Sequence, residues 1–150
     1  MIKKKIIKYV FFIFILSTNI VSAELIKISS EELKVDRNNG KSIFTGNVHA
    51  KDNSMELWSE KLTVFYDQKL DNITSIIAIK NVKILRIDFE AYGEKAIYDS
   101  KNNELIIEGN VVVIQNENQI VGDKLTMDLE NSTSIMTSNS KNRVNAQIIN

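Results

Sequence analysis

Apolar and polar residues alternate along several stretches of the chain, and this alternation predicts β-strands. Leu62 and Val64 share one face of such a stretch, whereas Lys61 and Thr63 occupy the opposite face. Residues 111–114 are β-branched throughout, a composition that favours extended structure. No segment carries an apolar helical stripe over three turns. The pattern therefore predicts an all-β chain.

Clusters of Asn, Asp, Gly, Ser and Thr separate these stretches and have the composition of turns. They lie at residues 38–40, 52–54, 71–72, 100–103, 116–118 and 131–134. Short strands spaced by about 8–12 residues are typical of an antiparallel sandwich, roll or barrel. The chain has no Pro. This fits uninterrupted strand pairing, because each Pro removes a hydrogen-bond donor.

The pattern repeats along the chain. Residues 46–67 align without a gap with residues 109–130, and a third copy begins at Asn81. In each copy an Asn-Val pair is followed, twelve residues later, by a small residue, an acid and Lys. These triplets are Ser59-Glu60-Lys61, Gly93-Glu94-Lys95 and Gly122-Asp123-Lys124. A partial copy starts at Ser30 and carries Glu32 in place of the Lys. We therefore expect one domain built from three and a half strand pairs.

The small residue before each acid has two interpretations. It can mark a bend or bulge, where Gly relieves strain, or Gly93 and Gly122 can simply end strands. The acids recur at one repeat position, beside Lys in the full copies, which favours a role in the bend over acid–base catalysis. Lys80 stands where the first and third full copies have Gly, so we expect an irregular strand start there.

The first 23 residues have the composition of a secretory signal peptide. Four Lys within residues 1–8 precede an apolar run at residues 9–16, and Val21 and Ala23 provide small residues before a cleavage point. The run is about half the length that a transmembrane helix needs. We expect cleavage after Ala23, which leaves residues 24–150 as the mature domain.

Charge and composition narrow the function classes. The whole chain has 19 basic and 19 acidic residues, and removal of the four leader Lys leaves a net charge of −4 on the mature part. This balance argues against nucleic-acid binding. With no Cys and one His, His49, we expect no disulfide, no thiolate metal site, no lipid-acylated Cys and no nucleophile–base pair. We expect neither a cofactor nor an enzyme, and a surface position for His49.

Residues 44–48 (FTGNV) and 58–62 (WSEKL) resemble the LptA/OstA-like repeat of lipopolysaccharide-transport proteins from Gram-negative bacteria. The resemblance covers roughly residues 25–149. It implies a β-jellyroll, in which antiparallel strands form two sheets folded into an open V. It also implies a periplasmic bridge component that carries the lipid A acyl chains of lipopolysaccharide in a hydrophobic groove, from the inner to the outer membrane. Like domains would join end to end by strand pairing, between an inner-membrane LptC-like and an outer-membrane LptD-like jellyroll, with possible homo-oligomers.

One apolar face follows from the alternation, and under the resemblance part of it lines the groove. The residues assigned to it are Ile26, Ile28, Phe44, Val48, Leu62, Val64, Val82, Ile84, Ala96, Tyr98, Val111, Val113, Leu125 and Met127. Each can equally be a core residue of a β-sandwich. The strands near residues 26–30 and 144–149 are the candidate open edges.

Two alternatives remain open at this point. In one, residues 6–23 are kept as a membrane anchor, as in an LptC-like member of the same pathway. In the other, the chain is a self-associating exported β-repeat protein without a lipid cargo. The basic residues Lys80, Lys83 and Arg86 belong either to a solvated face or to a groove rim that meets lipid phosphates.

Overall fold

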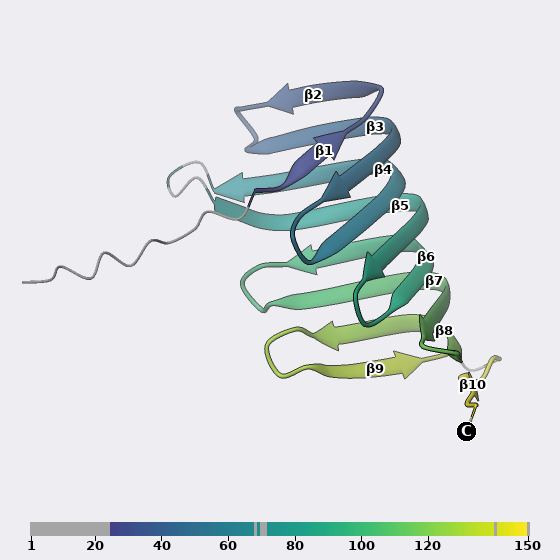
Figure 1. The fold of residues 1–150 in the computed structure, drawn as a ribbon. Helices are drawn as coiled ribbons and strands as arrows, with labels where there is room; N and C mark the ends of the chain where they lie inside the picture. The colour runs from purple at the N-terminus through teal and green to yellow at the C-terminus, as the bar shows by residue number, and fades with distance from the viewer. Residues whose placement is uncertain (1–24, 68, 70–71, 140, 150) are drawn as a thin grey trace, which may run out of the picture.

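The computed structural model describes residues 25–67, 69, 72–139 and 141–149, and these residues form ten β-strands (Figure 1). The predicted leader, residues 1–23, lies outside the described residues. The strands are β1 (Lys27–Ser29), β2 (Glu32–Asp36), β3 (Lys41–Lys51), β4 (Met55–Asp67), β5 (Asn72–Arg86), β6 (Glu90–Asp99), β7 (Glu104–Gln115), β8 (Asn118–Asp128), β9 (Thr133–Thr137) and β10 (Asn145–Gln147). Among the described residues, no helix is long and apolar enough to cross a membrane.

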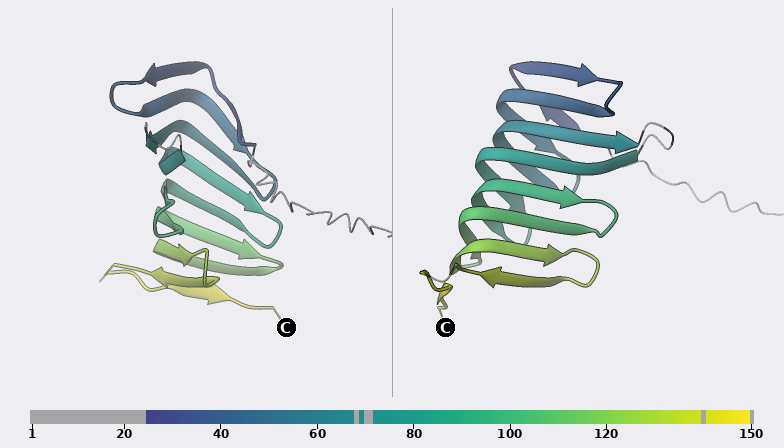
Figure 2. Two further views of the ribbon diagram at one scale, coloured as in Figure 1. Left: turned by 90° about the vertical axis from the view of Figure 1, so that its left-hand side faces the viewer. Right: turned by 180° about the vertical axis from the view of Figure 1, so that it is seen from behind.

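All pairings are antiparallel, and the strands follow the order β1-β3-β4-β5-β6-β7-β8-β10, with β2 on β3 and β9 on β8. Each strand from β3 to β8 curves round at one side of the stack, so that its two ends face each other (Figures 1 and 2). We call the two halves arm A, which includes β1 and β10, and arm B, which includes β2 and β9. This open, unclosed sheet confirms the predicted antiparallel jellyroll.

The strands are longer than the alternation predicts, because the chain bends where strands were expected to begin or end. Strands β3 to β8 have 10 to 15 residues, and the register between neighbours shifts at one level across the stack. Gly93 and Gly122 lie within β6 and β8 at these shifts. The interpretation of these glycines as strand ends is therefore wrong, and the bulge interpretation is confirmed.

Pairs of residues with positive φ produce the bends in the odd-numbered strands. Gly46 and Asn47 in β3 have φ of 83° and 45°, and Gly109 and Asn110 in β7 have φ of 85° and 48°. Glycine meets this requirement at no steric cost, and asparagine tolerates it better than most residues. In β5 the first position is Lys80, with φ of 66°, so the expected irregularity is a strained lysine in the same bend.

The recurring acid of the repeat accepts a hydrogen bond from the bend of the neighbouring strand. The side-chain amide of Asn81 donates to Glu60 Oε1 at 2.7 Å, and that of Asn47 donates to Glu31. At the other end of the stack Asp123 accepts a hydrogen bond from the backbone N–H of Asn139 at 2.8 Å. The acids thus hold adjacent bends in line, which supports their predicted structural role.

The core fills the inside of the V close to the bends. The largest fully buried side chains, each at most 1% exposed, come from both arms. They are Val48, Leu62, Val82, Ile84, Ile107 and Val111.

The sequence pattern missed the turn between β5 and β6, because Ile87 and Phe89 are residue types that favour strands. This turn is closed by the Arg86 N–H, which donates to the Phe89 carbonyl at 2.8 Å.

Replacement of a bend glycine is expected to destabilise the fold. In Gly109→Ala the new Cβ would lie 2.8 Å from Glu94 Cβ, at a φ of 85° that L-residues rarely adopt. We expect the free energy of unfolding to fall by about 1–3 kcal/mol. Urea denaturation followed by circular dichroism measures this change.

Lys80→Gly is the matched control, because it places glycine in the equivalent bend of β5. The left-handed strain of lysine, about 1–2 kcal/mol, exceeds the added chain entropy of glycine, about 0.5–1 kcal/mol. We therefore expect stability to rise by up to about 1 kcal/mol. A loss of stability in this variant would show that the bends do not demand glycine.

Candidate functional site

The fourteen residues assigned to the apolar face line the inside of the V. Eight belong to the buried core: Val48, Leu62, Val64, Val82, Ile84, Ala96, Val111 and Leu125. Five are partly buried and pack against that core: Ile28, Phe44, Tyr98, Val113 and Met127. Ile26, 36% exposed, precedes β1 and lines two cavities. The alternation therefore identifies which side chains point inward.

Two cavities open between the arms, farther from the bends. The first has a volume of about 350 Å³ and is bounded by Met55 and Leu57 of arm A and by Ile76 and Tyr98 of arm B. The second, of about 330 Å³, lies toward the C-terminal end of the stack, where Val113 faces Met127. Both volumes fall in the range of small-molecule pockets. A smaller hollow of about 70 Å³ adjoins Ile26 and Ile28.

The assigned residues divide between these cavities and the packed interior. Ile26, Ala96 and Tyr98 line the first cavity, whereas Val113, Leu125 and Met127 line the second. Ile26, Ile28 and Leu62 line the small hollow. The rest lie within the core or pack against it: Phe44, Val48, Val64, Val82, Ile84 and Val111. Lipid binding by any of them stays a prediction.

Sequence reasoning missed most of the wall of the two cavities between the arms. Ile73, Ile76 and Ala78 precede the bend of β5, and Leu105 holds the corresponding place in β7. The repeat was taken to begin at the Asn-Val pair, so the strand halves in front of that pair were not assigned. The apolar runs at residues 76–79 and 105–107 are a signal that could have indicated these strand halves, although a continuous run does not say which residues face inward.

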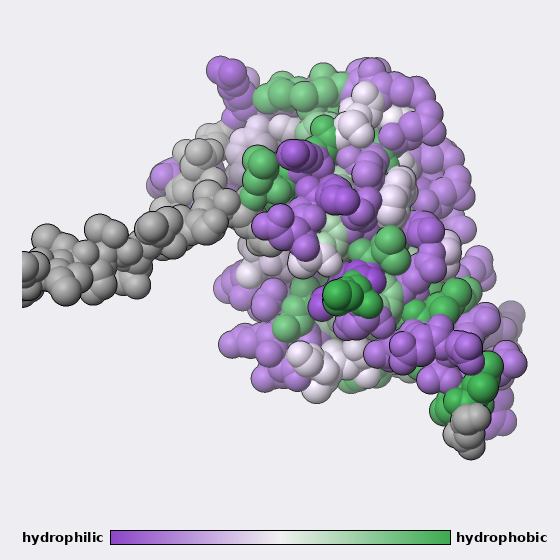
Figure 3. Space-filling model, viewed as in Figure 1, coloured by the Kyte–Doolittle hydropathy of each residue, from purple (hydrophilic) through white to green (hydrophobic). Residues whose placement is uncertain are grey.

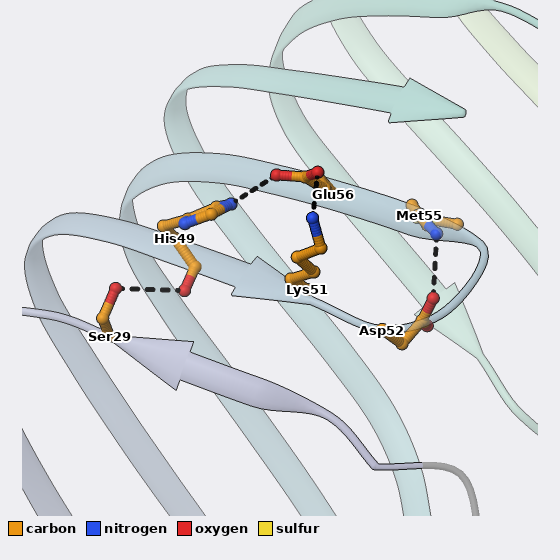
Figure 4. A network of polar contacts seen from close by, with 6 residues as sticks. All are labelled: Ser29, His49, Lys51, Asp52, Met55 and Glu56. Carbon is orange, nitrogen blue, oxygen red and sulfur yellow. Dashed lines mark hydrogen bonds and ion pairs between the residues drawn. The ribbon is translucent and has the colours of Figure 1, made fainter. Parts of the chain in front are cut away.

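The outer face of arm A carries a polar network instead (Figure 4). Glu56 on β4 accepts hydrogen bonds from Lys51 at 2.6 Å and from His49 at 2.9 Å, both on β3. The His49 ring stacks on Trp58, with centroids 4.8 Å apart and an interplanar angle of 7°. The bonds from Lys51 and then His49 hold the pKa of the Glu56 carboxyl below its usual value. This network ties neighbouring strands together, and His49 takes a half-exposed place in it.

The three basic residues singled out in the sequence do not form one cluster. Lys80 lies at the bend of β5, 4.0 Å from Glu60. Lys83 belongs to the outer face, where it donates to Glu90 at 2.6 Å and lies 5.5 Å from the centre of the Trp58 ring. That hydrogen bond to Glu90 raises the pKa of Lys83. Arg86 alone lines the cavities.

Metal chemistry finds no support in this geometry. Within the part of the chain that the structure describes, no three His, Asp or Glu side chains are grouped as a metal ion would require. The inner face instead offers apolar surface between two arms that converge at the bends. Such a surface suits an elongated apolar molecule better than a reaction that needs charged groups.

Comparison with known proteins agrees with the fold and the repeat. The family model described as "LptA/(LptD N-terminal domain) LPS transport protein" matches residues 27–133. The chain belongs to this family. Its members act in lipopolysaccharide transport, a role that is not enzymatic.

Individual relatives are distant. An uncharacterized protein of Rhizobium meliloti (strain 1021) is 29% identical over 113 residues, which cover 70% of this chain and 61% of that protein. The LPS-assembly protein LptD of Francisella tularensis subsp. holarctica (strain OSU18) is 32% identical over 103 residues, 61% of this chain and 12% of LptD. The chain thus spans less than two thirds of either relative.

A solved structure shows the same fold. The crystal structure of LptH, described as the LptA-homologous periplasmic component of the lipopolysaccharide transport device from Pseudomonas aeruginosa, matches with a TM-score of 0.75. The match is 18% identical and covers 85% of this chain and 96% of LptH. It confirms the jellyroll architecture that the family resemblance implies.

The Glu56 network predicts an acid-dependent contribution to stability. Because its folded pKa is depressed, the Glu56 carboxylate stabilises the fold above its unfolded pKa of about 4.3, and this contribution is lost as the pH falls through the lower, folded value. We therefore expect Glu56→Gln to be less stable than the wild type at pH 7. The difference should shrink toward pH 3, measured as urea midpoints.

Glu117→Gln, in the exposed turn between β7 and β8, is the control for loss of one carboxylate. Its difference from the wild type at pH 7 should be smaller than that of Glu56→Gln. An equal difference would contradict a specific contribution from the Lys51–Glu56–His49 network.

Proposed function

We propose that this protein is a lipopolysaccharide-binding bridge component that carries lipid A acyl chains between its two arms. The observation that supports this most is the pair of cavities on the inner face, both with walls drawn from arm A and arm B. Each CH₂ group removed from water gains about 0.8 kcal/mol, so an acyl chain has a strong preference for such a surface. Family membership supplies the cargo class.

The V has the shape that a passive carrier needs. Near the bends the side chains are packed and leave no space for a ligand, as the 0% exposure of Ile84, Ile107 and Val111 indicates. Away from the bends the arms separate and apolar side chains border open space. Acyl chains can enter from this side while the sugars of the lipid stay in water. The proposed step needs no bond making or breaking within the domain.

Both ends of the stack offer strands that can pair with a neighbour. At the N-terminal end, Leu33 and Val35 of β2 are 53% and 51% exposed, and apolar surface is visible over β2 in Figure 3. At the C-terminal end Ile135 of β9 is 64% exposed. We expect β-augmentation at these edges, with LptC-like and LptD-like jellyrolls or a second copy of this chain as partners. β2 and β9 extend the expected edges, which were β1 and the segment around β10.

The place of action follows from the leader. We propose that residues 1–23 are a signal peptide, cleaved after Ala23, and that residues 24–150 form the mature periplasmic domain. LptH, which shares the fold, is itself described as a periplasmic component. N-terminal sequencing of the protein recovered from cells distinguishes this from a retained, LptC-like anchor. A mature start at Glu24 supports cleavage.

A self-associating protein without lipid cargo is the contrasting candidate, supported by the exposed apolar edges alone. Depletion in cells separates the two. If the bridge proposal holds, newly made lipopolysaccharide accumulates before it reaches the outer membrane. Normal delivery in depleted cells would favour the second candidate.

Photo-crosslinking tests the groove directly. A photoreactive residue at Tyr98 or Met127, which line the two cavities, is expected to capture lipopolysaccharide in cells. The matched control is Thr126, which alternates with Leu125 and Met127 and therefore faces outward. Immunoblots for lipopolysaccharide adducts give the readout. Capture from Thr126 but not from its neighbour would contradict the groove assignment.

The edge proposal predicts protein adducts rather than lipid adducts. A photoreactive residue at Val35 of β2 or Ile135 of β9 should form covalent protein dimers or heteromers in cells. Ile97 of β6, a strand paired on both sides with β5 and β7, is the control and should give none. Equal yields from all three positions would indicate random collision, and the edge assignment would fail.

A further inference from the structure

We propose that Arg86 binds the anionic group, a phosphate in the first instance, of an amphiphile whose chains occupy the two cavities. This inference rests on the proposed function, because it assumes that apolar chains enter the V. It adds a headgroup contact and a position along the groove at which that contact is made.

Arg86 lies on the inner face because the alternation in β5 places Val82, Ile84 and Arg86 on one side of the strand. Val82 and Ile84 are buried in the core, whereas Arg86 stands at the last position of the strand and its side chain is 30% exposed. The guanidinium is therefore carried by rigid strand to the outer part of the V, next to open space.

Two cavities meet at this residue. Among the described residues, two border both cavities between the arms: Arg86, from arm A, and Leu129, which follows β8 in arm B. A molecule with several chains can place them in both cavities only if its headgroup lies close to this boundary. The position suits a charge on the ligand between two sets of chains.

The charges along the wall leave Arg86 as the group available to an anion. Among the described residues, it is the one cation that lines either of the two cavities between the arms, and the acids there are Asp52, Asp88 and Asp128. Asp52 accepts hydrogen bonds from Ser54 and the Met55 N–H. Asp128 accepts bonds within its own turn, including one from the Asn131 N–H at 2.9 Å. The carboxylates of Asp52 and Asp128 are therefore already hydrogen-bonded within turns of the chain.

Within the protein, Arg86 makes only a weak ion pair, with Asp88. Its Nε lies 3.2 Å from Asp88 Oδ1, but the contact lacks hydrogen-bond geometry and the buried Nε–H donates no hydrogen bond among the described residues. Asp88 is 49% exposed, on the short turn before β6. The guanidinium carbon also lies 5.3 Å from the centre of the buried Phe89 ring. A phosphate that accepts two parallel N–H bonds from a guanidinium binds it more strongly than a single carboxylate contact without hydrogen-bond geometry.

Calorimetric titration with two matched amphiphiles tests the inference. Dioctanoyl phosphatidic acid carries a phosphate, whereas dioctanoylglycerol has the same chains and no charge. We expect the wild type to bind the phosphate-bearing lipid about tenfold more tightly or better. Arg86→Gln should remove that preference and leave the dissociation constant for dioctanoylglycerol unchanged, and Arg86→Lys should keep part of the preference.

Lys61→Gln, on the exposed outer side of β4, is the control for loss of one positive charge and should retain the full preference. An equal loss in Lys61→Gln, or a full preference in a folded Arg86→Gln protein, would overturn the inference. So would Arg86-dependent binding of inorganic phosphate alone with equal affinity, since the site would then take the free anion. If neither lipid binds any variant, the groove itself fails, an outcome distinct from binding without preference.

Discussion

The architecture depends on the bend of the long strands, where one side-chain hydrogen bond recurs in β3 and β5. An asparagine with positive φ turns the strand, and the acid of the neighbouring strand accepts a hydrogen bond from its side chain, as in Asn81 with Glu60. Two successive residues with positive φ strain the backbone, and this strain costs free energy. The fold can offset the cost when the neighbouring strands bend at the same level. Because all six long strands bend at one level, the backbone pairing continues on both sides of the bend and offsets that cost.

The bend also determines what the inside of the molecule can hold. Side chains beside it are pressed between two arms and reach the packing of an ordinary core, as Leu62 and Ile107 show. Farther out the same alternation leaves apolar side chains next to open space. The fold therefore combines a stable core and a ligand surface on one face of one sheet. The outer face is held together by charged and aromatic side chains instead, such as Lys83 above Trp58.

The sequence predicted the class of fold and the inward face well. Alternation follows directly from the geometry of a strand, and the repeat of residues 46–67 at residues 109–130 shows that the same strand pair recurs. It did not predict where strands end. Ile87 and Phe89 conceal a turn because their types favour strands. Nor could it separate core from cavity: Val64 and Met127 occupy equivalent repeat positions, yet Val64 is buried and Met127 lines a cavity. Because the two residues lie equally far from their bends, that difference depends on the neighbouring strands. The division of Lys83 and Arg86 between opposite faces follows from simple alternation along β5, so the sequence pattern could have shown it.

The two edges of the sheet differ at the level of the bend, so the two ends of the stack are not equivalent. At the N-terminal end, β1 and β2 form one edge with only residues 30 and 31 between them, and the Glu31 N–H bonds to the Gly46 carbonyl at 3.0 Å. At the C-terminal end β9 ends at Thr137 and β10 begins only at Asn145, so the edge is not continuous there. An incoming strand can follow the first edge across both arms only if it bends at the same level. A straight, aggregation-prone strand can match one arm at most, so the curvature of the edge itself disfavours pairing with straight strands.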